Sequence, residues 1–364
     1  MNIGHPSARG SKGIALVMVL MVVTVLAALA GTFAYSMRVE VKLARNASWD
    51  TELEWLGRSG IEAAKFALSQ RSPQAAQFDS LGQAWAGGRM ETNDVVREWI
   101  GEWKDAGNGQ FRVSIEDTDR RFNINSCNTP SPEGEAILRQ ALTYVVQVDA
   151  SVTTAVVNSI LDWMDRDKAP RGGGAETEFY ESLPTPCIAK DGPIDDISEL
   201  LFINGIRDSP GIYWGSAVSP THRHPKSARQ SHFEEPVYPA GLREVFCAIS
   251  GNRLNINTAN AKTLSLIPFI DEGIAQQMLQ RRAGPDGQDG TEDDFPFRSE
   301  QEITGIPGVD PLRAGAFMRF LTVRSMVFEV RVQTRVGAHE RTYVALLRRM
   351  PPTFPILNLV WEDK

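Results

Sequence analysis

Acidic side chains are concentrated in the segment 162–178, where Asp and Glu recur at short intervals around the glycines at 172–174. Calcium takes roughly six to eight hard oxygen ligands, and a flexible loop lets several carboxylates fold around one ion. The composition therefore favours a calcium site, although the spacing and the terminal Glu do not fit an EF-hand loop. The alternative is a solvated acidic loop in which Arg166, Lys168 and Arg171 pair with the carboxylates.

A second acidic loop lies at 284–294, where Asp and Gly also recur at short intervals. This composition could hold calcium, but flexible surface loops look the same. A solvated loop is the favoured interpretation. The sequence contains no Gly-x-Ser-x-Gly, Walker or His-Glu-x-x-His motif, so we expect a protein that is not an enzyme.

The run from Ile14 to Met37 contains no charged side chain. At about 1.5 Å per residue it is long enough to cross a hydrocarbon core of roughly 30 Å as a helix. Arg9 and Lys12 precede it and favour an N-terminus in the cytoplasm, although Arg38 beyond the helix weakens this asymmetry. We expect a single-pass inner-membrane protein whose C-terminal part, after about residue 38, lies in the periplasm.

Beyond the membrane segment the pattern becomes amphipathic. Apolar and small residues such as Leu53, Leu56 and Gly60 recur at intervals of three and four, with charged residues between them. The pattern predicts that the same helix continues to about Ser69 and that Ser72-Pro73 ends it.

Alternating apolar and polar residues predict strands near both ends of the remaining chain. The expected strands are 111–116, 121–125, 327–335 and 341–348, with a turn at 337–339. We expect them to form one antiparallel sheet packed on the long helix. The intervening pattern is helical, in the segments 134–148, 152–164, 197–203, 261–267 and 272–282. Strands far apart in sequence with helices between them indicate an inserted helical domain.

Lys12-Gly13 ahead of a long apolar helix resembles the class III leader of type IV pilins and type II secretion pseudopilins. The resemblance implies cleavage between Gly13 and Ile14 with the helix retained; the alternative is an uncleaved signal anchor. Most pilin-like proteins carry Glu at the fifth mature position, where it neutralises the N-terminal amine of a neighbouring subunit in an apolar core. Here that residue is Met18. A subunit without the acid belongs at the end of a filament, unless Met18 is simply a lipid-facing residue.

Lack of this acid together with a large globular part resembles the K-type minor pseudopilins of type II secretion (general secretion pathway protein K). The resemblance implies an α+β fold: a pilin-like long N-terminal helix packed on an antiparallel sheet, with a large inserted α-helical domain. The implied units are a leader, a transmembrane helix, a pilin-like stalk with the first strands, a helical domain with helix-hairpin-helix-like segments, and C-terminal strands with a tail. Their boundaries are 1–13, 14–37, 38–126, 127–322 and 323–364.

The K-type family binds calcium in its helical domain, and it has a stretch very similar to the acidic segment. The resemblance therefore implies calcium as a cofactor. The candidate ligands are Asp162, Asp165, Asp167, Glu176 and Glu178.

The segments 121–126 and 253–258 echo each other, and the second continues into a stretch that resembles the helix-hairpin-helix module of DNA-binding proteins. In that module a Gly-rich hairpin brings backbone N–H groups up to a phosphate. Here the hairpin 268–272 has Phe269 and Asp271 where glycines should lie, and the hairpin 306–310 keeps one glycine but ends in an acid. The net charge of -7 also disfavours phosphate binding. Structural hairpins are the favoured interpretation, with no nucleic acid as a partner.

The cysteines are Cys127, Cys187 and Cys247. In an oxidising periplasm one disulfide with one thiol left over is possible. Their spacing is not typical of a metal site. Cys187 with either partner is the expected pair, and the sequence does not choose between them.

Together with these observations, the resemblance implies a non-enzymatic minor pseudopilin that caps the tip of the type II secretion pseudopilus and takes part in protein export across the outer membrane. The expected partners are the other minor pseudopilins of the tip complex, the inner-membrane assembly platform, the prepilin peptidase and the membrane. The alternative is a membrane-anchored helix-hairpin-helix DNA receptor of a competence system.

Overall fold

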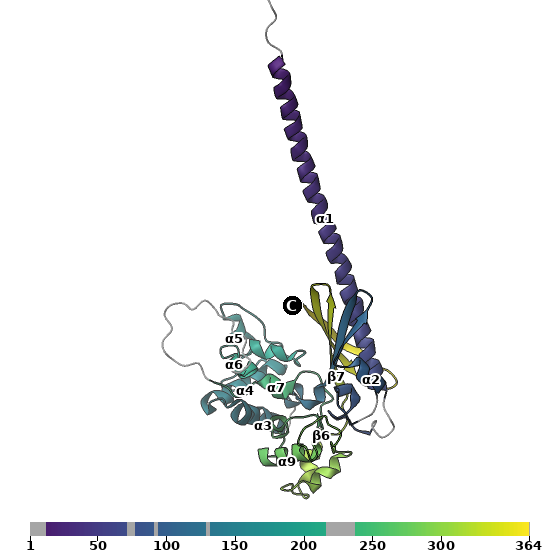
Figure 1. Ribbon diagram of the computed structural model, residues 1–364. Helices are drawn as coiled ribbons and strands as arrows, with labels where there is room; N and C mark the ends of the chain where they lie inside the picture. The colour runs from purple at the N-terminus through teal and green to yellow at the C-terminus, as the bar shows by residue number, and fades with distance from the viewer. Residues whose placement is uncertain (1–11, 71–76, 91–93, 129–131, 216–236, 364) are drawn as a thin grey trace, which may run out of the picture.

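The computed structural model describes residues 12–70, 77–90, 94–128, 132–215 and 237–363. A long helix, α1, projects from a globular head that is built on its C-terminal half (Figure 1). Helix α1 (Lys12–Ser69) has 58 residues, or roughly 87 Å at the usual rise. Its end at Ser69 confirms the predicted continuous helix, while Ser72-Pro73 lies outside the described residues. From Ile14 onward it contains a stretch of mean hydropathy 2.8, none of it buried, that is long and apolar enough to cross a membrane.

The head contains a five-stranded antiparallel sheet in the order β1-β2-β7-β8-β9. The strands are β1 (Trp103–Ala106), β2 (Gly109–Asp117), β7 (Val327–Val336), β8 (His339–Arg348) and β9 (Ile356–Asp363). Strands β2 and β7 pair along their lengths although about 210 residues separate them. Two residues, Gly337 and Ala338, connect β7 to β8. The predicted strands 111–116, 327–335 and 341–348 are confirmed.

Helix α1 lies directly on this sheet because two glycines face it. A Cβ atom at Gly57 would lie 2.4 Å from Cδ2 of Tyr343, and one at Gly60 would lie 2.3 Å from Cγ1 of Val332. Within the turn that precedes these contacts the helix buries Leu53 and Leu56 in a core shared with β2, β7 and β8. The amphipathic pattern of the sequence is therefore the packing face of the stalk.

The prediction that 121–125 joins the main sheet is wrong. Strand β3 (Phe122–Asn123) has only two residues and pairs in parallel with β4 (Phe246–Cys247) in a separate sheet. A short 3-10 helix, Thr118–Arg120, redirects the chain after β2, and a 3-10 helix at Ile124–Cys127 ends the strand. A second two-stranded parallel sheet joins β5 (Leu254–Asn255) to β6 (Leu321–Thr322).

Helices dominate the chain between β2 and β7, as predicted. The α-helices of the head are α2 (Asp94–Trp99), α3 (Pro132–Gln140), α4 (Ala150–Met164), α5 (Thr177–Glu181), α6 (Gly211–Trp214), α7 (Leu242–Val245), α8 (Ala261–Leu264), α9 (Glu272–Arg282) and α10 (Ala314–Met318). Helix α3 continues as a π-helix, Ala141–Val146, and the remaining 3-10 helices are Ala84–Ala86, Ile197–Phe202 and Glu300–Gly305. The segment 197–203 is thus a 3-10 helix, and 261–267 is helical only in its first half.

The inserted region has two lobes with separate hydrophobic cores. The similar segments 121–126 and 253–258 each supply an asparagine that makes equivalent hydrogen bonds in its own lobe. In the first lobe, the side-chain amide of Asn125 donates to the carbonyl of Ile194 at 2.9 Å and accepts from its N–H at 2.7 Å. In the second lobe, Asn257 makes the same two bonds to Phe297, each at 2.8 Å. In both lobes the clamped residue follows a proline and precedes a 3-10 helix. The two lobes are therefore built on one plan.

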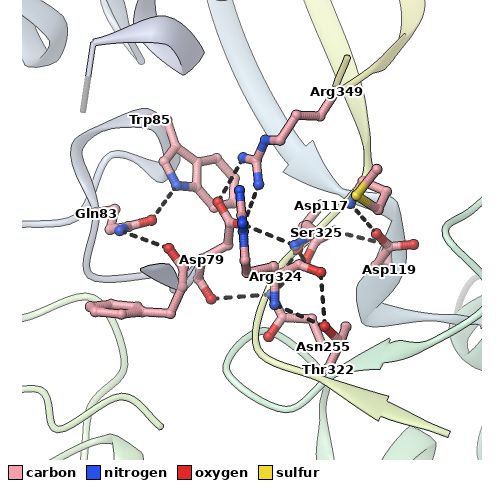
Figure 2. A network of polar contacts seen from close by, with 12 residues as sticks. Asp79, Gln83, Trp85, Asp117, Asp119, Asn255, Thr322, Arg324, Ser325 and Arg349 are labelled. Carbon is pink, nitrogen blue, oxygen red and sulfur yellow. Dashed lines mark hydrogen bonds and ion pairs between the residues drawn. The ribbon is translucent and has the colours of Figure 1, made fainter. Parts of the chain in front are cut away.

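A buried polar network joins the sheet to the lobes (Figure 2). Asp79, in the connection after α1, pairs with Arg349, the residue after β8, through bonds of 2.6 and 2.9 Å. Asp79 also accepts from the N–H of Ser325 at 2.8 Å. Both charged side chains are buried. This ion pair therefore fixes the end of the sheet where β8 stops against the segment that returns from the insertion to β7.

Asp117 and Asp119 extend the network from the end of β2. Asp117 accepts hydrogen bonds from the hydroxyls of Ser325 and Thr258, each at 2.6 Å, and from the amide of Asn255 at 3.2 Å. Asp119 accepts from the N–H groups of Gly251 and Met326. Burial is the main cause that raises the pKa of Asp117 to about 7 and that of Asp119 to about 6.

We expect Gly60→Ala to lower the free energy of unfolding of the head by at least about 1 kcal/mol, because the added methyl overlaps Val332. The loss should appear even though Ala is the better helix former by about 1 kcal/mol. Urea unfolding of the head measures it. The matched control is Gly315→Ala in α10, whose Cβ would meet no atom within 4 Å and which should be neutral or stabilising. Equal stability of the two variants would contradict the close packing of α1 on the sheet.

The head should be less stable at about pH 8 than at about pH 5.5. A folded-state pKa of about 7 for Asp117, above its ordinary 3.8, means that its contribution is complete below about pH 4 and is lost as the pH rises through 7. Over this interval Asp117 alone should lower the free energy of unfolding by about 2 kcal/mol.

Urea unfolding at both pH values tests this expectation. Asp117→Asn should flatten the pH dependence, whatever its effect on stability at one pH. Glu178→Gln, at an exposed residue of α5, should leave the pH dependence unchanged. An identical dependence in Asp117→Asn and the wild type would assign the effect to other groups.

Candidate functional site

The candidate metal site lies where α4 ends and the acidic loop turns back toward α5. Asp165 follows the last residue of α4 in an extended conformation, and Gly173 adopts a left-handed conformation with φ of 81° that reverses the loop. Carboxylate oxygens of Asp165, Asp167 and Glu176 all lie within 4.8 Å of one another. Three of the predicted ligands therefore converge on one centre.

Asp162 lies beneath this centre, fully buried in the last turn of α4. A Cβ atom at Gly174 would lie 2.0 Å from its Oδ2, so only glycine lets the loop close over the carboxylate. Arg171 donates to Asp162 through Nη1 at 2.7 Å and also bonds to Asp165. Of the three cations proposed as ion-pair partners, Arg171 makes these pairs, whereas Arg166 and Lys168 are exposed.

Several carboxylate oxygens of the site have no partner among the described residues. They are both oxygens of Glu176, Oδ1 of Asp165 and Oδ1 of Asp191, all of them buried. Burial is the main cause that raises the pKa of Glu176 to about 7, and repulsion from Asp162 and Asp165 adds to it. An arrangement with one arginine for several acids leaves negative charge uncompensated, and a divalent cation with oxygen ligands fits this donor set.

Asp191 was missed by sequence analysis, and Glu178 does not belong to the converging group. Asp191 repels Glu176 electrostatically and has a left-handed backbone, with φ of 50°. It lies 15 residues beyond Glu176, and the only local signal is the Asp191-Gly192 turn sequence. Glu178 lies on α5 with an exposed side chain.

The second acidic loop is held by its own polar contacts. Asp289 pairs at 2.7 Å with Arg282, whose side chain is buried and also donates to the carbonyls of Ile256 and Ala259. Asp294 accepts from the N–H of Gly290 at 2.8 Å. The loop therefore compensates a buried arginine, although the sequence alone favoured a solvated loop.

The hairpins that resemble a DNA-binding module use their acids as internal caps. Asp271 accepts from the N–H of Ile274 at 2.8 Å at the start of α9, and so occupies the donor that a phosphate would use. Phe269 takes the left-handed position with φ of 71°. Asp310 accepts from the N–H of Leu312 and pairs with Arg313. This geometry does not favour the DNA-receptor alternative.

The predicted disulfide is wrong, because Cys127, Cys187 and Cys247 are all free. Cys187 packs at the edge of the first lobe's core. Cys247 is buried with its Sγ 3.5 Å from the carbonyl of Thr118. Burial raises the pKa of both Cys127 and Cys247, the latter to about 12, so these two residues are inert core thiols.

Comparisons with known proteins agree with this architecture. Residues 120–210 match the family model described as "Type II secretion system (T2SS), protein K". Type II secretion system protein K of Aeromonas hydrophila is 24% identical over 353 residues, covering 91% of each chain. The protein of that name from Pseudomonas aeruginosa is 24% identical, covering 79% of this chain and 76% of the relative.

Among solved structures, a chain of the GspK-GspI-GspJ complex of the type 2 secretion system of enterotoxigenic Escherichia coli matches with a TM-score of 0.64. The identity is 21%, and the match covers 88% of this chain and 99% of that chain. The likeness supports the overall fold of this chain, with its long helix, antiparallel sheet and helical insertion. The family is not known as an enzyme family. On the matched segment and the near full-length relatives together, the chain is similar to type II secretion system protein K, the K-type minor pseudopilins.

Proposed function

We propose that the chain is a non-enzymatic minor pseudopilin that caps the tip of the type II secretion pseudopilus and takes part in protein export across the outer membrane. The observation that carries this proposal is the combination of an exposed apolar half of α1 with a bulky helical insertion on the head. The apolar half can pack among the stalks of sister subunits. The insertion makes the head wide, so another subunit could not easily follow it along the filament axis.

Met18 supports the position at the tip. Its side chain is exposed on α1, and no acid lies between Ile14 and Met37. A subunit at this place has no carboxylate to neutralise the buried amine of a subunit ahead of it, and an unpaired charge in an apolar core is expensive. The end of the filament is the position that does not need this pairing.

The proposed partners follow from the relatives and from α1. The solved relative forms a complex with GspI and GspJ, and the corresponding minor pseudopilins are the proposed neighbours of this chain. We propose further that the prepilin peptidase cuts between Gly13 and Ile14, that the new N-terminus is methylated, and that the inner-membrane assembly platform receives the mature chain. The single anchor would then lie in the inner membrane, with the head in the periplasm.

We also propose that the site at the end of α4 binds calcium. Asp165, Asp167 and Glu176 would be the ligands, with Asp191 completing the set and Asp162 supporting the loop from below. The ion would neutralise carboxylates that burial and mutual repulsion disfavour. It would thereby hold the loop against α4 and stabilise the first lobe.

Blocking the proposed cleavage should abolish the function. In a strain that lacks the chain, the wild type should restore export and have a mature mass that begins at methylated Ile14. Gly13→Leu should keep the leader and fail to restore export, because the helix cannot join the filament from an unprocessed precursor. Intact mass spectrometry and the amount of exported protein measure both effects. The control is Gly315→Ala in α10 of the head, whose added Cβ meets no atom within 4 Å. Normal export by Gly13→Leu, or a mature chain that begins beyond Tyr35, would contradict the proposal.

Calcium should raise the melting temperature of the head by several degrees, because ligand that binds only the folded state stabilises it. Glu176→Gln and Asp165→Ala should remove this rise and weaken calcium binding by at least about tenfold in calorimetric titration. Glu178→Gln is the matched control, since Glu178 is exposed and outside the converging group. If Glu178→Gln abolished binding and Glu176→Gln did not, the assignment of the ligands would be overturned.

A further inference from the structure

Strand β9 is an edge of the main sheet, and it is exposed along its length. Every residue from Ile356 to Glu362 is exposed, on both faces of the strand. Five of them are large and apolar: Ile356, Leu357, Leu359, Val360 and Trp361 are 41–60% exposed. No other strand pairs with its outer edge in the part of the chain that the structure describes. A long apolar edge strand is a template for pairing with another chain.

The opposite edge of the same sheet is protected. Strand β1 has only four residues, and two of them, Lys104 and Asp105, are charged. Its Trp103 is covered by the guanidinium groups of Arg112 and Arg335, at 5.2 and 4.4 Å from the ring centre. Short length and charge are the usual ways in which a sheet edge avoids unwanted pairing. Because β1 has this protection and β9 does not, the exposure of β9 is specific to one edge.

The apolar face of β9 continues the buried face of the sheet. Trp361 and Leu359 lie opposite Tyr343 and Ala345 of β8, and paired residues share a face. Tyr343 and Ala345 are buried in the core that α1 covers. Helix α1 packs mainly on β2, β7 and β8, and it leaves the side chains of β9 exposed. The surface next to the stalk therefore ends in uncovered apolar side chains.

The membrane does not cover this surface. Tyr343 contacts the stalk at Gly57, which is 20 residues beyond Met37. At about 1.5 Å per residue this level lies roughly 30 Å below the end of the apolar segment. Trp361, paired with Tyr343, lies at the same level.

A second copy of the chain does not fit as an antiparallel partner of β9. The first residue of β8, His339, contacts Trp49 of α1, and the later residue Tyr343 contacts Gly57. Strand β8 therefore runs in the same direction as α1. Strand β9 is antiparallel to β8 and runs back toward the membrane end of the stalk. Two β9 strands paired antiparallel would point the two α1 helices in opposite directions, which is impossible for two copies anchored in one membrane.

We propose that the outer edge of β9 accepts an extended strand of a different, neighbouring pilin-like subunit anchored in the same membrane. This inference rests on the proposed function, which places such subunits beside the stalk. Backbone hydrogen bonds to the free edge would give affinity, and apolar side chains of the added strand would cover Leu359 and Trp361. The head would thus be attached to its neighbour by a shared sheet as well as by packing of the α1 helices.

Photo-crosslinking of the full-length chain, produced in its host together with the other pseudopilins, tests this contact. The probe p-benzoylphenylalanine at Val360 should give an adduct with another pseudopilin, identified by mass spectrometry. The same probe at Asp105, an exposed residue of the protected edge β1, should not. Adducts only with a second copy of the chain, equal adducts from both edges, or no adduct from Val360 would overturn the proposal.

Charged substitutions provide the second measurement. Leu359→Lys combined with Trp361→Lys should reduce co-purification with the neighbouring subunit by about tenfold, because a strand cannot cover two lysines. The melting temperature should stay close to that of the wild type, since both side chains are already exposed. If the double variant co-purifies as well as the wild type, β9 is not the docking edge. If the wild type itself co-purifies with no pseudopilin, the proposed function fails together with the β9 contact.

Discussion

The buried ion pair between Asp79 and Arg349 fixes the connection between the two parts of the head. Moving two charges out of water costs several kcal/mol for each ion, and a buried pair persists only when its geometry is good and its remaining positions are hydrogen-bonded. Here the pair is bidentate, and the N–H of Ser325 satisfies the carboxylate further. Asp79 follows the stalk, Arg349 follows β8, and Ser325 lies just before β7, so one interaction holds three segments that are far apart in sequence. Figure 2 shows Asp117 at the same place, where it accepts a hydrogen bond from Asn255 of the second lobe.

This junction explains how a pilin-like head tolerates a large insertion. The chain leaves the sheet at the end of β2 and returns at the start of β7, and these two strands pair with Asp117 opposite Phe328. The two connections of the insertion therefore lie next to each other, and the sheet remains continuous across them. The lobes then need only one point of attachment. Each lobe closes on its own hydrophobic core through an equivalent asparagine clamp, at Asn125 and at Asn257.

Local periodicity was sufficient to predict the elements that dominate the fold, whereas long-range pairing was not. The end of α1 at Ser69, the β7-β8 hairpin and the bounds of α9 follow from spacing within a few residues. Strand β3 is only two residues long and depends on a partner more than 120 residues away, so no local pattern could assign it correctly. Asp165, Asp167 and Glu176 belong to one short segment and were predicted together, whereas the fold brings Asp191 only near enough to repel Glu176. The predicted disulfide was wrong for the same reason, because the distance between two cysteines depends on the tertiary structure.

The head buries acidic groups in two places, and it deals with their charge in two different ways. At the junction, every carboxylate oxygen of Asp79, Asp117 and Asp119 accepts at least one hydrogen bond from the chain itself. At the end of α4, by contrast, the oxygens of Glu176 and one oxygen each of Asp165 and Asp191 are buried without a donor among the described residues. Unsatisfied buried carboxylates are costly, and they persist in proteins when a metal or a proton neutralises them. The pKa of Glu176 is raised, so a proton would neutralise this carboxylate more readily when no cation is bound. The contrast between a fully satisfied cluster and an unsatisfied one in the same head is the strongest structural support for the proposed calcium site.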